Sequence, residues 1–463
     1  MSEPVTTDTL AALDPEKLRD WVECQRWYAS KSRHVTHVDL LEAATLGAEP
    51  PLLVLALLQT GFATGTHELY QLALGLRPAG SEGPDQITEG GGWSVYDALA
   101  EPDLGRVLLR SVEKGVELEA EQGRFSFHRV EGAPELAREV PVRPMGVEQS
   151  NSSLVFGDDV VCKLFRKLEP GVNPELEMLR FLTAHGFENI APLYGWAEYE
   201  GRSLSATLVV VQRFYSDGVG GWELALDEIT SDPYGFLERL GALGEVTARM
   251  HTVLGSDAAD PAFSPEEPSQ EALSLLTATV DEDIERIFAR LPDHPDLAAI
   301  AGYGQDVQER LSMLAKLGTG GRVIRTHGDY HLGQTLLTPR GWVILDFEGE
   351  PARSLPERRQ KRSPLRDVAG MLRSFAYVAS AAQIQRGVAA PADWEQRARE
   401  TFLEHYFEHV ESSLLPHGEQ ATAHLLAVFE LEKAVYELRY ERDNRPDWVS
   451  IPVAGIKRLL EDS

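Results

Sequence analysis

A chain of 463 residues, 43% of them hydrophobic, is long enough for two or three domains with sizeable cores. The formal net charge of −29 argues against a surface for nucleic acid or anionic lipid, although a few cations inside a cleft can still bind a phosphate-bearing substrate. The absence of a long apolar run, of a signal-peptide pattern and of more than two cysteines excludes a membrane span and a cysteine-rich zinc site and favours a cytoplasmic protein.

Residues 1–90 are expected to form a first segment of the chain. The stretch "PEKLRDWVECQRWYA" has helical periodicity, whereas "PLLVLALLQTGF" and "ELYQLALGL" are typical of strands. The following "RPAGSEGPDQITEGGG" is rich in Gly and Pro and predicts a long turn or linker.

Residues 91–215 form a second segment, which predicts a sheet with one notable helix. In "SSLVFGDDVVCKLFRKL" two short strands meet at a hairpin turn, and "LSATLVVVQRFY" is typical of a buried strand. The stretch "NPELEMLRFLTAHGF" is helical, with Asn173 as N-cap and Pro174 as its first helical residue.

Residues 216–463 are expected to be mostly helical. A periodicity of about 3.6 residues occurs in "YGFLERLGALGEVTARMHTVL", "DEDIERIFARL", "PLRDVAGMLRSFAYVASAAQI" and "AHLLAVFELEKAVYELRYERD". A sheet-rich half followed by a helical half predicts an α+β protein with a ligand cleft between two lobes.

The stretch "THGDYHLGQTLLTPRGWVILDFEGE" interrupts this helical half with loop, short strand, turn and strand. Phosphoryl transfer from ATP needs a carboxylate that orients and deprotonates the acceptor hydroxyl, and oxygen ligands that hold Mg²⁺ against the phosphates. Asp329 is followed five residues later by Gln334, and Asp346 comes after the apolar strand, with Glu348 close behind. This order matches the kinase pattern of a catalytic Asp, a metal-binding amide and a second metal-binding Asp.

A cation for the phosphates and an acid that holds this cation complete the requirement. Lys163 lies in the predicted strand "VVCKLF", and Glu177 follows fourteen residues later on the predicted helix. The ordered set predicts a kinase that uses ATP and Mg²⁺. The phosphate loop lacks the glycine-rich pattern, and an ordinary polar hairpin turn explains it equally well. The residues that could cradle phosphates there are Gln149, Ser150, Asn151, Ser152 and Ser153.

Further motifs are spread along nearly the whole chain: "QRWYASKSR", "QSNSSLVFGDDVVCKLFRKLEPGVNPELE", "HGDYHLGQ", "VILDFEGEPARSLPERRQKRSPLRDVAGMLRSFAYVA" and "EKAVYELRYERDNRPDWVSIP". In these motifs the chain resembles the bacterial maltokinases, within the aminoglycoside-phosphotransferase-like branch of the kinase fold. The resemblance implies a bilobal protein-kinase-like fold with an N-terminal cap, a β-rich intermediate subdomain and a helical C-lobe.

The same resemblance implies phosphorylation of maltose at its anomeric hydroxyl by ATP and Mg²⁺, which gives maltose 1-phosphate for α-glucan (glycogen) synthesis. It implies Asp329 as catalytic base, Gln334 and Asp346 as metal ligands with help from Glu348, and Lys163 with Glu177 as phosphate anchor. Docking of the cap on trehalose synthase is a further implication.

A sugar site is expected near the end of the chain, because carboxylates, amides and Arg bind hydroxyls and aromatic faces pack on sugar rings. His331 is expected to lie close to the sugar. The remaining candidates come from "EKAVYELRYERDNRPDW" and are Glu432, Tyr436, Arg439, Tyr440, Arg445 and Trp448. A surface helix whose tyrosines pack the lobe is the alternative.

Three residues are expected to support the site rather than take part in chemistry. His251 is interpreted as a packed helix histidine, and His327 and Asp367 as groups that brace the catalytic loop. Two other functions are also compatible with the chain. One is a kinase of the same fold for glucosamine, another hexose or an aminoglycoside; the other is a non-catalytic ATP-binding module that docks on a partner enzyme.

Overall fold

The computed structural model describes residues 13–136, 138–146, 151–202, 204–269, 302–312 and 321–461, together with Leu10, Leu297 and Ile300. The chain divides into two compact units. The N-terminal unit comprises Met1–Thr183 and Ala191–Ser216, and the C-terminal unit comprises Ala184–Ile190 and Asp217–Ser463. The predicted helix "DEDIERIFARL" lies outside the described residues.

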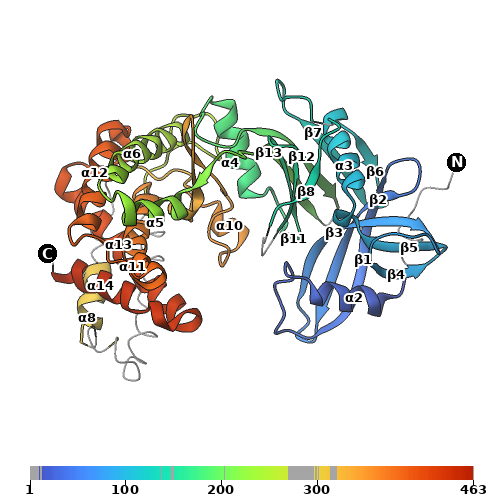
Figure 1. Cartoon of the computed structure of the whole chain (residues 1–463), viewed down its shortest axis with the longest axis horizontal. Coiled ribbons are helices and arrows are strands. Elements are labelled where there is room, and N and C mark those ends of the chain that lie inside the picture. Colours follow the sequence, from blue (N-terminus) through green and yellow to red (C-terminus); the bar gives the residue numbers. More distant parts are fainter. Residues whose placement is uncertain are drawn as a thin grey trace. The chain divides into compact units, whose positions relative to one another are not determined.

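The N-terminal unit begins with an antiparallel sheet of order β1-β2-β3-β5-β4, to which β11 is added at β3 (Figure 1). Helix α2 (Pro15–Cys24) precedes it, and its N-cap Asp14 accepts the N–H groups of Glu16 and Lys17. The strands are β1 (Val35–Leu46), β2 (Leu52–Phe62), β3 (His67–Pro78), β4 (Gln86–Gly90), β5 (Trp93–Asp97) and β11 (Lys167–Leu168).

Strand β4 corrects the prediction of a long turn at this point of the chain. Its residues pair with β5, from Gln86 opposite Tyr96 to Gly90 opposite Trp93. The backbone of β4 forms a strand because β5 offers it hydrogen-bond partners. This pairing outweighs the low strand propensity of the local Gly-rich sequence.

The second sheet of this unit has the order β6-β7-β12-β13-β10-β9-β8. The bounds are β6 (Glu117–Glu119), β7 (Gly123–Arg129), β8 (Val142–Pro144), β9 (Asn151–Phe156), β10 (Val160–Phe165), β12 (Leu193–Gly201) and β13 (Ser205–Arg213). The predicted hairpin is β9–β10, and the predicted helix is α4 (Pro174–Ala184).

The prediction of a single helix in this part of the chain was wrong, because α3 (Pro102–Lys114) precedes the second sheet. Its signals were visible in the sequence: Pro102 stands in the first turn, and Gly115 ends the helix with φ of 60°. Leu104 and Leu108 are buried on the side that packs against the unit.

The C-terminal unit is mostly helical and holds one small sheet of order β14-β15-β16. Its strands are β14 (Val219–Gly220), β15 (Thr335–Thr338) and β16 (Gly341–Ile344). The helices are α5 (Gly221–Ser231), α6 (Gly235–Leu254), α8 (Gly304–Ser312), α10 (Leu355–Arg358), α11 (Leu365–Arg386), α12 (Trp394–His409), α13 (Glu419–Asn444) and α14 (Ser450–Glu461). The 3₁₀ turns are η4 (Leu332–Gln334), η5 (Ser412–Leu414) and η6 (Pro446–Trp448), while η1 (Ala98–Ala100) belongs to the other unit.

Helix α11 forms the centre of this unit. It packs on α5, α12, α13 and α14, and α6 runs beside α12 (Figure 1). Because neighbours cover α11 on several sides, Val368, Met371 and Phe375 are all fully buried. The two units confirm the α+β class. None of the helices in the described part of the chain is long and apolar enough to span a lipid bilayer.

Candidate active site

Asp329 lies in the loop that leads into η4 and β15 of the C-terminal unit. Gly328 precedes it with φ of +85°, a left-handed conformation that favours glycine. The Asp329 carboxylate is 25% exposed and lies 3.7 Å from Lys433 Nζ and 3.9 Å from His331 Nε2. His331 Nδ1 accepts the N–H of Gly333 at 3.0 Å, so in the neutral imidazole the proton is on Nε2, the nitrogen nearer Asp329. The loop therefore presents a partly exposed carboxylate between two potential proton donors.

Asp367, near the start of α11, holds the backbone of this loop. It is 2% exposed and accepts the N–H groups of His327 at 2.7 Å and Gly328 at 3.0 Å. His251 Nε2 donates to the same carboxylate at 3.2 Å, and its Nδ1 lies 3.0 Å from the Tyr406 hydroxyl. Burial alone would raise the pKa of Asp367, but the bond from His251 and the nearby N–H groups hold this pKa below its usual range. The prediction that Asp367 braces the catalytic loop is confirmed.

His327 links the same loop to the strand that follows it. Its Nε2 donates to the carbonyl of Leu345 at 2.9 Å, one residue before Asp346. Its ring also contacts Tyr330 and Phe347, with centroids 5.3 and 4.9 Å away. The prediction that His327 braces the loop is therefore confirmed as well, and the contact ties the positions of Asp329 and Asp346 to each other.

Gly370 allows α11 to approach the loop closely. A Cβ atom at this position would lie only 2.6 Å from the carbonyl oxygen of Tyr330. The Tyr330 hydroxyl is anchored on the other side by Thr247 of α6, at 2.8 Å. The residue after Asp329 is thus held from two helices.

Asp346 has an unusual backbone. Its φ of 61° makes it the single non-glycine residue with positive φ in the described part of the chain. Such strain is common at functional sites. The Gln334 side-chain amide donates to Asp346 Oδ2 at 3.0 Å, which brings the two expected metal ligands together. A carboxylate beside an amide suits Mg²⁺, which prefers oxygen ligands, and Glu348 follows two residues later, part-buried.

In the N-terminal unit, Lys163 of β10 forms an ion pair with Glu175 of α4, with Nζ and Oε2 2.8 Å apart. The pair is well buried, since the side chains are 12% and 1% exposed. Asn173 caps α4 as predicted, because its side chain accepts the N–H of Glu175 at 2.8 Å. Sequence reasoning expected Lys163 to pair with Glu177, on the same helix, and did not identify Glu175. Both acids lie in the first turn, and only the packing of α4 shows that Glu175 reaches the lysine.

The expected phosphate cradle differs from the prediction. Gln149 and Ser150 lie outside the described residues. Asn151, Ser152 and Ser153 belong to β9, where they pair with residues 163–165 of β10 instead of forming an open loop. Ser152 accepts a hydrogen bond from Arg166 Nε at 2.8 Å, and Ser153 is buried.

The C-terminal unit contains a cavity of about 690 Å³ that the end of the chain helps to line. Lys433, Tyr436 and Glu350 stand in its wall, and Lys433 is the residue that reaches Asp329. Burial works against the charge of Glu350, but Lys433, Arg353 and the hydrogen bond from Tyr436 hold the pKa of Glu350 below its usual range. Glu432 lines the cavity as well and pairs with Arg366 at 2.9 Å.

The other predicted sugar residues occupy a different place. Arg439 is part-buried within electrostatic reach of Tyr436, and Tyr440 is 46% exposed. Arg445 contacts the rings of Tyr440 and Trp448, at 5.5 and 4.8 Å. None of these four, Arg439, Tyr440, Arg445 or Trp448, is among the described residues that line the cavity. The prediction of one continuous sugar-binding face along α13 is therefore not supported.

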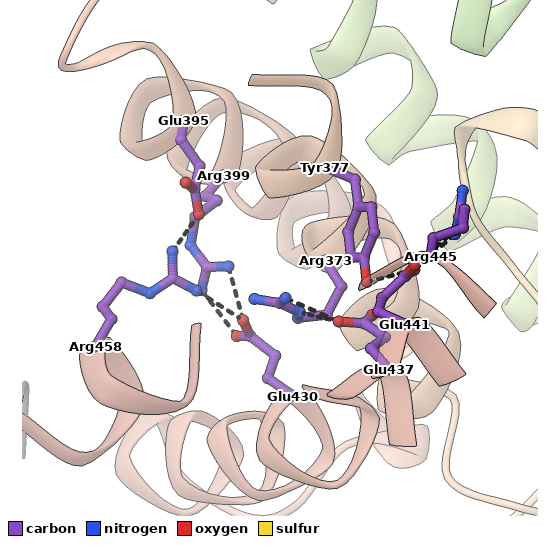
Figure 2. A network of polar contacts seen from close by, with 9 residues as sticks. All are labelled: Arg373, Tyr377, Glu395, Arg399, Glu430, Glu437, Glu441, Arg445 and Arg458. Carbon is purple, nitrogen blue, oxygen red and sulfur yellow. Dashed lines mark hydrogen bonds and ion pairs between the residues drawn. The ribbon is translucent and has the colours of Figure 1, made fainter. Parts of the chain in front are cut away.

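A partly buried polar network, shown in Figure 2, joins the end of α13 to its neighbours. Arg445 donates to Glu441 at 2.8 and 2.6 Å, and Tyr377 of α11 donates to the same carboxylate at 3.1 Å. Trp448 stacks on Tyr377, with centroids 6.2 Å apart. In the same network Arg373 of α11 donates to Glu437 of α13. Beside this contact, Glu430 of α13 pairs with Arg399 of α12 and with Arg458 of α14, and Arg458 also pairs with Glu395 of α12.

Two family models match the chain: the maltokinase N-terminal cap domain over residues 21–101, and the phosphotransferase enzyme family over residues 141–403. The chain belongs to the phosphotransferase enzyme family. A glucosamine kinase of Mycolicibacterium smegmatis is 30% identical over 331 residues, which is 69% of this phosphotransferase and 80% of that relative. A glucosamine kinase of Streptacidiphilus jiangxiensis is 26% identical, over 68% of this chain and 73% of the relative.

A solved structure of a glucosamine kinase in complex with glucosamine, ADP and inorganic phosphate superposes on the phosphotransferase with a TM-score of 0.74. The identity is 20%, and the match covers 98% of this chain and 99% of that chain. This similarity shows the fold. The protein-kinase-like α+β fold with a cap, a β-rich lobe and a helical C-terminal region is thus confirmed.

Sequence reasoning missed Lys433, Glu350 and Glu175. Lys433 is adjacent to Glu432 and three residues before Tyr436 on α13, so its helix face was a usable signal. No spacing rule indicated Glu350 or Glu175, because their partners come from other elements.

Proposed function

We propose that this phosphotransferase is an ATP-dependent sugar kinase whose acceptor is glucosamine or a close relative of it. The proposal of glucosamine as acceptor is supported by the 30% identity to a glucosamine kinase over 80% of that relative. The proposal of phosphoryl transfer to a sugar is supported by the position of Asp329, which lies beside Lys433 of the cavity wall. The cavity is large enough for a hexose. The bound ADP of the structural relative supports a nucleotide as phosphoryl donor.

In this proposal Asp329 orients the acceptor hydroxyl and takes its proton. Lys433 Nζ lies 3.7 Å from this carboxylate, so a cation stands beside the proposed base. Asp367 and His327 do not touch the substrate, and their part is to keep the loop in place. Catalysis of phosphoryl transfer depends mainly on such positioning and on electrostatic stabilisation.

Gln334, Asp346 and Glu348 would hold Mg²⁺, which when bound neutralises charge on the phosphates. The Gln334 amide nitrogen donates to one oxygen of Asp346, which leaves oxygens of both side chains as candidate ligands. Lys163, kept in place by Glu175, would bind the phosphates of the nucleotide.

Maltose is the second candidate, because the maltokinase N-terminal cap domain matches residues 21–101. The residues expected to bind a second sugar ring, Tyr440 and Trp448, do not line the cavity with Tyr436, which weighs against recognition of a disaccharide along α13. Docking of the cap on trehalose synthase stays a prediction from the resemblance.

The test is an ATP-consumption assay with glucosamine, N-acetylglucosamine, glucose and maltose, followed by phosphorus NMR of the product. We expect glucosamine to give the highest kcat/KM and a product that still reduces copper reagents, since its anomeric hydroxyl stays free. Preference for maltose with a non-reducing product would replace this acceptor by the second candidate. Absence of turnover with every sugar, together with intact nucleotide binding, would favour the non-catalytic module.

A further inference from the structure

The cavity of the C-terminal unit has a charge that differs from that of the protein as a whole. Among the described residues that line it, nine are Arg or Lys and six are Asp or Glu, although the whole chain carries a formal charge of −29. An excess of cations inside a concave site attracts anions, because low-dielectric walls focus the local field. The function proposed above does not require this excess of positive side chains in the cavity wall.

Most of the acids in the wall already have partners. Glu350 pairs with Arg353, Glu432 with Arg366, and Lys361 with Glu266. The Asp367 carboxylate is occupied by the catalytic-loop N–H groups and His251. Glu357 accepts from Ser354 at the start of α10. These carboxylates are therefore already engaged by the groups named here.

Arg362 is the clearest uncompensated cation. Its guanidinium donates to the side-chain oxygen of Gln360 at 2.9 Å, and no carboxylate of the described chain lies within 4.0 Å of it. Burial lowers the pKa of Arg362 to about 10, with Arg366 and Arg353 acting in the same direction. A group of guanidinium ions with too few carboxylates is electrostatically unfavourable until an anion joins it.

Arg366 supplies a second donor in the same wall. Its Nη2 binds Glu432, whereas its Nη1 is buried and has no hydrogen-bond partner. Buried donors without partners are rare and often mark the place of a ligand or an ordered water. Arg362 lies three residues before α11 and forms a bridge with Ile324, whereas Arg366 lies in the first turn of that helix, and both line the cavity. Because Arg366 contributes to the lowered pKa of Arg362, the two guanidinium groups lie near each other.

We propose that Arg362 and Arg366 form an anion site in this cavity for a phosphate monoester or inorganic phosphate, distinct from the nucleotide phosphates. A guanidinium group can donate two parallel hydrogen bonds to a phosphate, and two neighbouring guanidinium groups favour a dianion over a monocarboxylate. Among the described residues that line the cavity are none of those proposed above for the nucleotide and the metal, which are Lys163, Gln334, Asp346 and Glu348. The inference does not depend on the identity of the acceptor sugar.

The test is calorimetric titration of the full chain with inorganic phosphate, with a hexose 6-phosphate and with chloride at matched ionic strength. We expect saturable binding of at least one phosphate species that weakens about 10-fold or more in Arg362→Gln, the loss typical of a charge-assisted hydrogen bond. Arg366→Gln should weaken binding as well. Arg362→Gln is the main variant, because Arg366 pairs with Glu432 and its loss could also destabilise the fold.

Two controls separate this site from the surroundings. Arg249→Gln removes the same charge from an exposed position on α6 outside the cavity, and it should leave binding unchanged. Lys163→Met removes the proposed nucleotide anchor and should also leave it unchanged. Tighter binding of the hexose phosphate assigns a phosphorylated sugar as the occupant, and equal binding assigns free phosphate. No saturable binding by the wild type, or binding that is lost in Lys163→Met but kept in Arg362→Gln, overturns the proposal.

Discussion

Replacement of Gly370 by Ala tests how tightly α11 holds the candidate catalytic loop. The added Cβ atom would lie 2.6 Å from the carbonyl oxygen of Tyr330, and an ordinary contact begins at 3.4 Å. Either the helix or the loop must therefore move by roughly 0.8 Å. The loop cannot yield without changing Asp329, because Asp329 is covalently joined to Tyr330.

The magnitude follows from two opposing effects. Ala is a better helix former than Gly by about 1 kcal/mol, whereas forcing an extra methyl group into a packed interior costs about 1–3 kcal/mol. The free energy of unfolding should therefore fall by at most about 2 kcal/mol. Activity should fall further, by about 10- to 100-fold in kcat, since a displacement of about 1 Å in a catalytic group can cost about 100-fold.

The assay measures kcat and KM for ATP with the best sugar, together with urea unfolding. Gly220→Ala is the matched control, because its added methyl group meets no atom within 4 Å and its φ is −58°. A Gly370→Ala variant with full kcat and higher stability than the wild type would refute the argument, since it would show that the contact with Tyr330 does not position the loop.

Asp329→Asn keeps the shape and removes the proposed base, so kcat should fall about 10²–10⁴-fold with little change in nucleotide affinity, and near-normal turnover would disprove the role. Asp346→Ala should abolish activity at every Mg²⁺ concentration, whereas Gln334→Ala should be milder because water can replace a neutral amide; Mg²⁺ titrations of the rate compare the two. The pKa of Asp367 is lowered on folding, so its stabilising effect is complete above the ordinary carboxyl pKa of about 3.9 and is lost as the pH falls through the folded-state pKa. Asp367→Asn should therefore show a weaker loss of unfolding free energy on acidification below about pH 4.5 than the wild type, and an equally steep loss would contradict this.

Local patterns were sufficient for the sheet-rich and helical halves and for the candidate catalytic loop, although they missed β4 and α3. Asp329, Gln334 and Asp346 could be placed because their spacing follows loop, turn and strand within 18 residues, and such short-range geometry depends little on the rest of the fold. The role of Asp367 in holding the loop could also be predicted, because a buried acid near the start of a helix needs hydrogen-bond donors nearby.

Long-range pairings escaped sequence reasoning. Glu175 is a partner of Lys163 that sequence reasoning did not name, and this contact depends on how α4 packs against β10. The resemblance to maltokinases implied maltose as the acceptor, with the sugar residues on one helix near the end of the chain. The structure separates Tyr436, in the cavity wall, from Trp448, which stacks on Tyr377.

The sequence by itself was sufficient for the phosphotransferase chemistry and the α+β class, and it placed the candidates Asp329, Gln334 and Asp346 in one short segment. Only the tertiary structure shows that Lys433 lies beside Asp329 and that Glu441 forms an ion pair with Arg445. The physical reason is that periodicity defines which face of a helix is apolar, whereas the packing angle and depth of α13 define which of its polar side chains meet the catalytic loop. Packing of this kind is a property of the whole unit, and no window of the sequence contains it.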